Sequence, residues 1–256
     1  MLIVIAVILG WLAGVLVNYL ADVLPLRRRF ARPFCIACDA DQPYLSYLVF
    51  PRKCSKCGSR RSIRTWIVEL CFVFSTALIR QYPPDGLGFW LGQVVLIYFG
   101  VIVIIDLEYR LILHPMSLFG AVLGLLVGIY LNGLLSTILG GLVGFGSMWL
   151  LYLFGAVLMR WIARRRGEEL TDVALGFGDV NLSGVLGLFL GWPAILVGLF
   201  ISVLIGGVFS LLYLIVMVAM RRYRLYSALP YGPFLVAGAV LILFFRDYLI
   251  QFFSGL

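Results

Sequence analysis

Four cysteines stand in two closely spaced pairs near the N-terminus. The pairs Cys35-x-x-Cys38 and Cys54-x-x-Cys57 are separated by 15 residues. This is the spacing of structural zinc sites, in which each pair supplies two thiolates to one tetrahedral ion. Reversible disulfides and four unconnected thiols are the alternatives. We expect structural Zn²⁺, because a segment as short as residues 25–64 cannot build a sufficient core of its own.

Two aspartates adjoin long apolar runs. Asp106 follows the run 94–105, and Asp179 ends Gly176-Phe177-Gly178-Asp179 before another apolar stretch. A carboxylate beside hydrocarbon is costly and usually has a task. If the two converge, they form an aspartyl dyad that shares one proton and activates water against an amide. Gly176 and Gly178 would let the backbone bend and approach a substrate. The alternative is that both are helix-end carboxylates without a catalytic role.

The single histidine, His114, excludes several other chemistries. A metalloprotease of the H-E-x-x-H type needs two histidines, and a His-ligated catalytic zinc normally uses at least two. A serine hydrolase is disfavoured as well, because Ser147 lacks the second glycine of a G-x-S-x-G elbow.

The elements that must position these residues are predicted to be membrane helices. Of the 256 residues 63% are apolar and only 12% are charged, far from the composition of a soluble domain. Apolar runs broken by turn residues predict an all-α polytopic membrane protein with about eight transmembrane helices and a small cytoplasmic zinc-binding loop domain. The expected spans are 1–24, 66–82, 89–105, 116–131, 134–159, 180–190, 193–220 and 231–253.

The basic residues predict how these spans are oriented. On the eight-span arrangement, all of the 20 Lys and Arg residues except Arg80 and Arg246 fall on one side, which the positive-inside rule makes cytoplasmic. Both termini then lie outside. The net charge of +8 is explained by topology and contact with membrane lipids, so no nucleic-acid partner is expected. We divide the chain into a first transmembrane helix (1–24), a cytoplasmic zinc-binding domain (25–64) and a seven-helix catalytic domain (65–256).

Several motifs, taken in order along the chain, resemble those of the type IV prepilin leader peptidases, which are bacterial aspartic proteases of the GxGD type. They are Gly10-x3-Gly14-x3-Asn18 with Leu24-Pro25, the two cysteine pairs, Ile63-Arg64-Thr65-Trp66-Ile67-Val68-Glu69, Ile105-Asp106-Leu107-Glu108, Leu175-Gly176-Phe177-Gly178-Asp179-Val180, and Pro230-Tyr231-Gly232-Pro233-Phe234.

This resemblance implies a function. Members of the family remove the short basic leader of prepilins or pseudopilins at the cytoplasmic face of the inner membrane, and many then methylate the new N-terminus with S-adenosylmethionine. Asp106 and Asp179 would be the catalytic pair, and Glu69 is a candidate for the methyl-donor site. A glutamate favoured by a helix N-terminus is the alternative for Glu69. The other functions considered are a peptidase that does not methylate, a non-catalytic scaffold and a transporter.

Two positions depart from the family pattern. His114 stands in Leu113-His114-Pro115, where the family often has an acid, and a histidine at a helix start is the simplest interpretation. Asn181 replaces a frequent lysine after Gly-Asp-Val. Neither change touches the two aspartates or the four paired cysteines.

Overall fold

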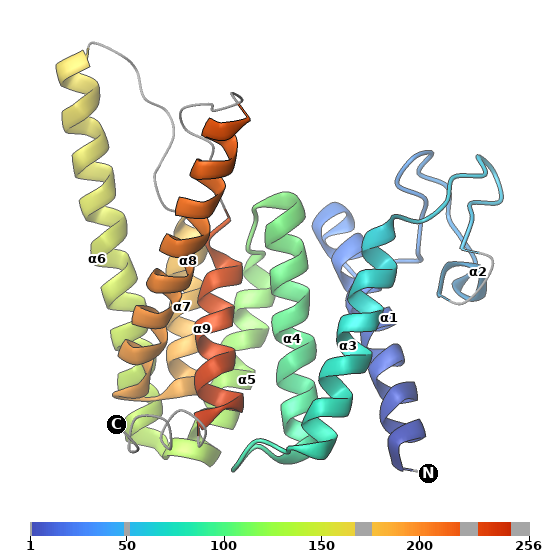
Figure 1. Ribbon diagram of the computed structural model, residues 1–256, viewed down its shortest axis with the longest axis horizontal. Helices are drawn as coiled ribbons and strands as arrows, with labels where there is room; N and C mark the ends of the chain where they lie inside the picture. The colour runs from blue at the N-terminus through green and yellow to red at the C-terminus, as the bar shows by residue number, and fades with distance from the viewer. Residues whose placement is uncertain (1, 49–51, 167–175, 221–229, 247–256) are drawn as a thin grey trace. The chain divides into compact units, whose positions relative to one another are not determined.

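The computed structural model describes residues 2–48, 52–166, 176–220 and 230–246. Within these ranges the regular elements are helices: α1 (Leu2–Arg27), α2 (Tyr44–Leu48), α3 (Ile63–Gln81), α4 (Gly88–Tyr109), α5 (His114–Asn132), α6 (Leu134–Arg166), α7 (Phe177–Leu190), α8 (Ala194–Ala219) and α9 (Gly232–Phe244) (Figure 1). The chain divides into two compact units, Met1–Tyr109 and Arg110–Leu256, and each is described by itself.

In the first unit, α1 packs against α3 and α4. Small residues on one face of α1 allow backbone contact: a Cβ added to Gly10 would lie 2.6 Å from Cα of Val73, and one added to Gly14 would lie 2.7 Å from Cα of Glu69. Membrane helices commonly pack through such small residues. The cysteine-bearing loops and α2 gather at the end of this unit where α1 stops and α3 begins (Figure 1).

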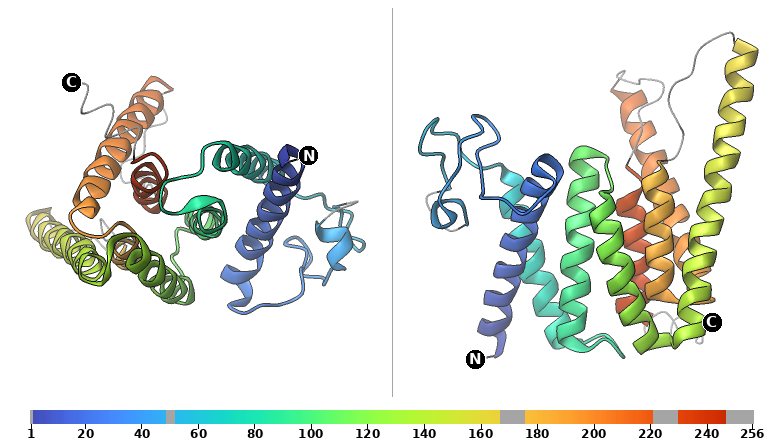
Figure 2. Two further views of the ribbon diagram at one scale, coloured as in Figure 1. Left: turned by 90° about the horizontal axis from the view of Figure 1, so that it is seen from below. Right: turned by 180° about the vertical axis from the view of Figure 1, so that it is seen from behind.

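In the second unit, the short helix α7 is central. It packs against α5, α6, α8 and α9, and Leu182 and Phe189 on it are almost fully buried. Only Gly133, with a φ of +79°, separates α5 from α6, so these two helices meet there. Figure 2 shows α6 continuing past α5 and α7 at the other end.

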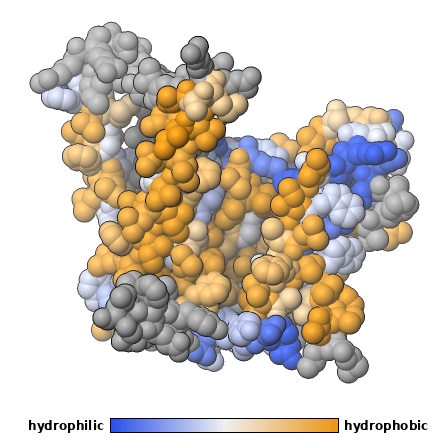
Figure 3. Space-filling model, viewed as in Figure 1, coloured by the Kyte–Doolittle hydropathy of each residue, from blue (hydrophilic) through white to orange (hydrophobic). Residues whose placement is uncertain are grey.

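Large apolar side chains cover the outside of the helices (Figure 3). Leu135 and Trp90, for example, are at least 70% exposed, which is unfavourable in water. Five of the described helices are long and apolar enough to cross a membrane, namely α1, α4, α5, α6 and α8. This is the pattern of a multi-pass membrane protein.

The prediction of an all-helical fold is confirmed, whereas eight crossings are not. Three expected spans correspond to α3, α7 and α9, which are not among the five long apolar helices. α7 and α9 are short, with 14 and 13 residues, and α3 carries Arg64, Glu69 and Arg80. Residues 247–253 of the last expected span lie outside the described residues.

Candidate functional site

The four paired cysteines converge on one point. The Sγ atoms of Cys35 and Cys57 are 3.6 Å apart, as are those of Cys38 and Cys54, and all four lie within 4.8 Å of one another. A tetrahedral zinc ion with Zn–S bonds of about 2.3 Å has sulfur–sulfur edges of about 3.8 Å. The four thiols therefore fit a metal ion of this kind, and the predicted cluster is confirmed as a set of residues that could hold one.

Both cysteine pairs are shaped by the same backbone turn. In the first, the N–H of Asp39 donates to the carbonyl of Cys35 over 2.8 Å, and in the second the N–H of Gly58 donates to the carbonyl of Cys54 over 2.9 Å. Asp39 and Gly58 both have left-handed φ angles, of 54° and 69°, which aspartate tolerates and glycine adopts freely. The repeated turn explains why a glycine follows the second pair.

The electrostatics of the cluster favour a thiolate at Cys54. Hydrogen bonds from the backbone N–H groups of Cys57 and Lys56 lower the pKa of Cys54 to about 6. At Cys38, a hydrogen bond from the backbone of Ala40 lowers the pKa, but the neighbouring thiols and desolvation outweigh it and raise the value to about 12. Because thiolates are the metal-binding form, Cys54 is prepared for a cation.

Asp106 lies in the last turn of α4 and is only 5% exposed. The apolar residues before it, including Ile102 and Ile105, are buried as well. The sequence therefore brings a carboxylate to the end of an otherwise apolar helix, as predicted.

Asp179 lies in the first turn of α7 and is 9% exposed. Its N–H donates to the carbonyl of Gly176 over 3.1 Å, and its own carbonyl accepts from the Ser183 hydroxyl over 2.7 Å. A Cβ added to Gly176 would lie 3.5 Å from Asp179 Oδ2, so the carboxylate folds back over the start of the helix. Tyr231, which precedes α9, is close enough to experience the charge of Asp179. Asp106 and Asp179 belong to different units, and their convergence stays a prediction.

The surroundings of the two glycines before Asp179 differ. Gly176 has a φ of −75°, which any residue can adopt. A Cβ on Gly178 would lie 3.0 Å from Cβ of Ile112, so this glycine is needed for close packing beside the start of α5. Neither glycine has a left-handed φ, and their close approach to a substrate stays a prediction.

Glu69 is buried inside the first unit, with 3% exposure. Its Oε2 accepts from Nη2 of Arg52 and from the indole N–H of Trp11, each over 3.0 Å, and the Arg52 guanidinium lies 4.4 Å from the ring centre of Trp66. Glu69 Oε1 has no hydrogen-bond partner among the described residues. Because Glu69 lies beyond the first turn of α3, the alternative of a glutamate stabilised by the helix N-terminus is wrong.

α1 continues past the expected end of the first span at residue 24 to Arg27, and Asp22 within it is a buried ion-pairing residue. Its carboxylate accepts from Arg61, Arg64 and Tyr47. One feature of the sequence indicates this role: Asp22 is the sole acid in the apolar run of residues 1–24, and an acid in such a run usually has a function.

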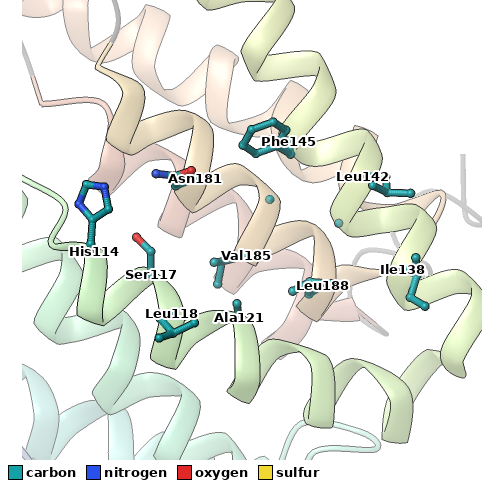
Figure 4. A pocket seen from close by; sticks show the side chains of 12 residues that line it. His114, Ser117, Leu118, Ala121, Ile138, Leu142, Phe145, Asn181, Val185 and Leu188 are labelled. Atoms are coloured by element: carbon teal, nitrogen blue, oxygen red, sulfur yellow. The ribbon is translucent and has the colours of Figure 1, made fainter.

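An open groove of about 460 Å³ lies in the second unit between α5 and α6, on the face of α7 (Figure 4). His114, Ser117 and Asn181 form its polar end, near the start of α5 and α7. Apolar side chains such as Leu118 and Leu188 line the rest. Both residues that depart from the family pattern, His114 and Asn181, thus lie in one groove, which offers an apolar surface with a hydrogen-bonding end.

Comparison with known proteins gives consistent matches. Residues 90–212 match the type IV leader peptidase family, a segment that contains Asp106 and Asp179. Three curated relatives are each named prepilin leader peptidase/N-methyltransferase. They come from Aeromonas salmonicida (27% identity, covering 78% of this chain and 65% of the relative), Legionella pneumophila (28%, 88% and 76%) and Pseudomonas aeruginosa (29%, 78% and 65%).

The chain therefore matches a little under two thirds of the length of two of these relatives. No solved structure matches it.

Proposed function

We propose that the chain is a member of the type IV leader peptidase family, whose model residues 90–212 match, and that it is an aspartic endopeptidase that removes the basic leader of type IV prepilins or pseudopilins. We propose that it also methylates the new N-terminus. The observation that carries the proposal is the family match over a segment with a buried carboxylate at an end of each of two helices, Asp106 on α4 and Asp179 on α7.

The helix ends suggest how the two carboxylates divide the work. Asp179 lies at the positive end of the α7 dipole, which stabilises an anion, whereas Asp106 lies at the negative end of the α4 dipole, which disfavours one. In our proposal Asp179 is ionised and takes a proton from water, and the resulting hydroxide attacks the scissile carbonyl carbon. Asp106 donates its proton to the carbonyl oxygen. The tetrahedral intermediate then breaks its C–N bond: Asp179 gives the proton that it took from water to the leaving amine, and the hydroxyl of the intermediate returns its proton to Asp106 as the new carboxyl group forms.

The four cysteines would hold a structural zinc ion. Their sulfur geometry fits such an ion. The basic residues around them support a cytoplasmic location, where thiols stay reduced. We accordingly propose a protein of the bacterial inner membrane with eight crossings, in which α3, α7 and α9 are the shorter ones. Short crossings are acceptable where they line a cavity rather than lipid.

S-adenosylmethionine would supply the methyl group. Glu69 fits a role in holding it, because Oε1 is a buried acceptor without a partner among the described residues. Glu69 Oε2 is already held by Arg52 and Trp11, so the carboxylate is fixed in orientation. Replacing Glu69 with Gln should reduce methylation and leave cleavage intact, as measured by product mass. Equal loss of both activities would instead indicate a structural role.

The apolar helix of a prepilin would enter sideways among the membrane helices. The groove on α7 supports this route, since its polar end lies at the start of the helix that carries Asp179. The basic leader would then stay at the cytoplasmic face.

The experiment that tests the function is a cleavage assay in detergent with a purified prepilin and S-adenosylmethionine. Wild type, Asp106→Asn and Asp179→Asn are compared, with thermal melting to confirm that each is folded. We expect cleavage after the leader glycine and one added methyl group for wild type, and no cleavage for either variant. Cleavage without the methyl group would indicate a peptidase alone. If a variant cuts normally, the aspartyl mechanism is wrong and the scaffold and transporter alternatives return.

A further inference from the structure

Asp22 lies at the centre of a buried ion-pair network in the first unit. It is the only acid in α1 and is 4% exposed. Arg61 donates to Oδ2 over 2.6 Å, Arg64 donates to Oδ1, and the Tyr47 hydroxyl also donates to Oδ2. A buried carboxylate is tolerated only when its hydrogen-bonding capacity is well satisfied, and removing one partner is then strongly destabilising. This network therefore holds its members in one arrangement.

Two of these partners belong to the cysteine-bearing segment. Tyr47 is in α2, between the two cysteine pairs, and Arg61 follows the second pair by four residues. The guanidinium of Arg61 lies 3.9 Å from the centre of the Tyr47 ring and donates to the Tyr47 hydroxyl over 2.9 Å. The N–H of Arg61 also donates to the carbonyl of Arg52 over 3.3 Å, which closes the loop that contains Cys54 and Cys57. The folded cysteine domain is thus fastened to α1 at Asp22.

The third partner continues the network to α4. Arg64 lies in the first turn of α3. One of its guanidinium nitrogens donates a hydrogen bond to Asp22, and another donates to Glu108 in the last turn of α4. A carboxylate at the C-terminal end of a helix is disfavoured by the helix dipole, so Glu108 depends on this cation. Glu108 is two residues from Asp106.

We propose that these bonds form a positioning device, in which the metal-loaded cysteine domain holds the last turn of α4, and with it Asp106, in place. The connection runs from Tyr47 and Arg61 through Asp22 and Arg64 to Glu108. Arg64 and Asp22 are positioning residues, because they act through α4 rather than on the substrate. The effect on catalysis by Asp106 rests on the proposed function, whereas the coupling between the cysteine domain and the last turn of α4 does not.

The coupling is tested by hydrogen exchange on the full-length protein in detergent. Zinc-loaded wild type is compared with protein stripped by o-phenanthroline, and zinc is then added back. We expect stripping to accelerate amide exchange by about tenfold in the last turns of α4 as well as in residues 30–62, and zinc to reverse both changes. In Glu108→Gln the α4 segment should exchange fast already, and stripping should add little, because its connection to the cysteine domain is broken.

A matched control comes from a second ion pair between α1 and the cysteine-bearing segment. Arg27 donates to Asp39 over 2.6 Å, but this pair is exposed and exposed pairs contribute little. Arg27→Gln should therefore leave α4 exchange at the wild-type value. Glu108 is itself partly exposed, so Glu108→Gln is expected to fold, and Arg64→Gln provides a second break in the same connection.

The effect of this coupling on catalysis is measured as kcat and KM for cleavage of a purified prepilin. Both Glu108→Gln and Arg64→Gln should lower kcat by about tenfold to a hundredfold, the effect of a small displacement of a catalytic group, with little change in KM and full zinc content. Stripping that unfolds residues 30–62 without changing α4 exchange would overturn the proposal, as would variants with wild-type kcat. A wild type that never cleaves would refute the proposed function instead, and the coupling would still be decided by exchange.

Discussion

A glycine contact between α6 and α7 makes the position of Asp179 sensitive to a single methyl group. A Cβ added to Gly187 would lie 2.1 Å from the carbonyl oxygen of Gly140, and one added to Gly140 would lie 2.4 Å from the carbonyl oxygen of Gly187. Both obstacles are backbone atoms, which cannot turn aside as a flexible side chain can. Gly187→Ala must therefore push the two helices apart by about 1 Å.

The expected size of the effect follows from two opposing terms. Overpacking of this kind lowers the free energy of unfolding by about 1–3 kcal/mol, whereas replacing glycine by alanine in a helix raises it by up to about 1 kcal/mol. A modest net loss of stability is therefore expected. Asp179 lies eight residues away on the same helix, which is about 12 Å along its axis. Because a displacement of about 1 Å can reduce catalysis by about a hundredfold, activity should suffer more than stability.

The assay compares prepilin cleavage and thermal melting in detergent for wild type, Gly187→Ala and Gly146→Ala. Gly146 also lies on α6, but an added Cβ there would meet nothing within 4 Å, so this control should keep wild-type activity. Gly187→Ala should have a lower melting temperature and should cleave prepilin about a hundredfold more slowly. If Gly187→Ala is as active and as stable as Gly146→Ala, the close backbone contact and the argument from it are refuted.

Three further changes test other parts of the structure. Cys54→Ser should remove the bound metal, measured as zinc per protein, whereas Cys71→Ser should retain it because Cys71 lies in α3 outside the cluster; equal zinc in both would refute the assigned ligands. Trp11→Phe removes the indole donor to Glu69 and should lower the free energy of unfolding by about 1–2 kcal/mol, and unchanged thermal melting would contradict this. Gly191→Ala forces an alanine to a φ of +70° with its Cβ 2.7 Å from Ser136 Oγ, and should cost at least about 1–2 kcal/mol, which a wild-type melting temperature would disprove.

Helix positions were predictable because apolar runs and their interruptions are local. The expected helix at 89–105 is observed as α4, and the one at 180–190 as α7. α6 is longer than expected, because it continues from the expected end at residue 159 to Arg166. The expected span ends where the apolar residues stop, but arginine is a good helix former and charged residues continue the helix into water.

The cysteine cluster was predictable for the same reason, since its ligand pairs and turns are short-range patterns. The bonds around Asp22 were not predictable. Its partners Tyr47, Arg61 and Arg64 lie 25 to 42 residues away, and nothing local distinguishes them from their neighbours. Which arginine meets which acid depends on how α1, α3 and α4 pack, and hence on close contacts such as that of Gly14 with Glu69.

The arginines near the cysteine domain therefore have a structural role in addition to their effect on membrane topology. Arg52, Arg61 and Arg64 were assigned to topology, yet in the structure they pair with Glu69, Asp22 and Glu108. The orientation that we propose is not weakened, because the positive-inside rule counts lysine and arginine whether or not acids lie nearby. What changes is the expected result of removing them. Replacing an arginine that only contacts lipid should leave the structure intact, whereas replacing Arg61 or Arg64 removes one of the two cations that pair with the buried carboxylate of Asp22. Neutralising either should therefore loosen the bonds around Asp22 before it alters orientation in the membrane.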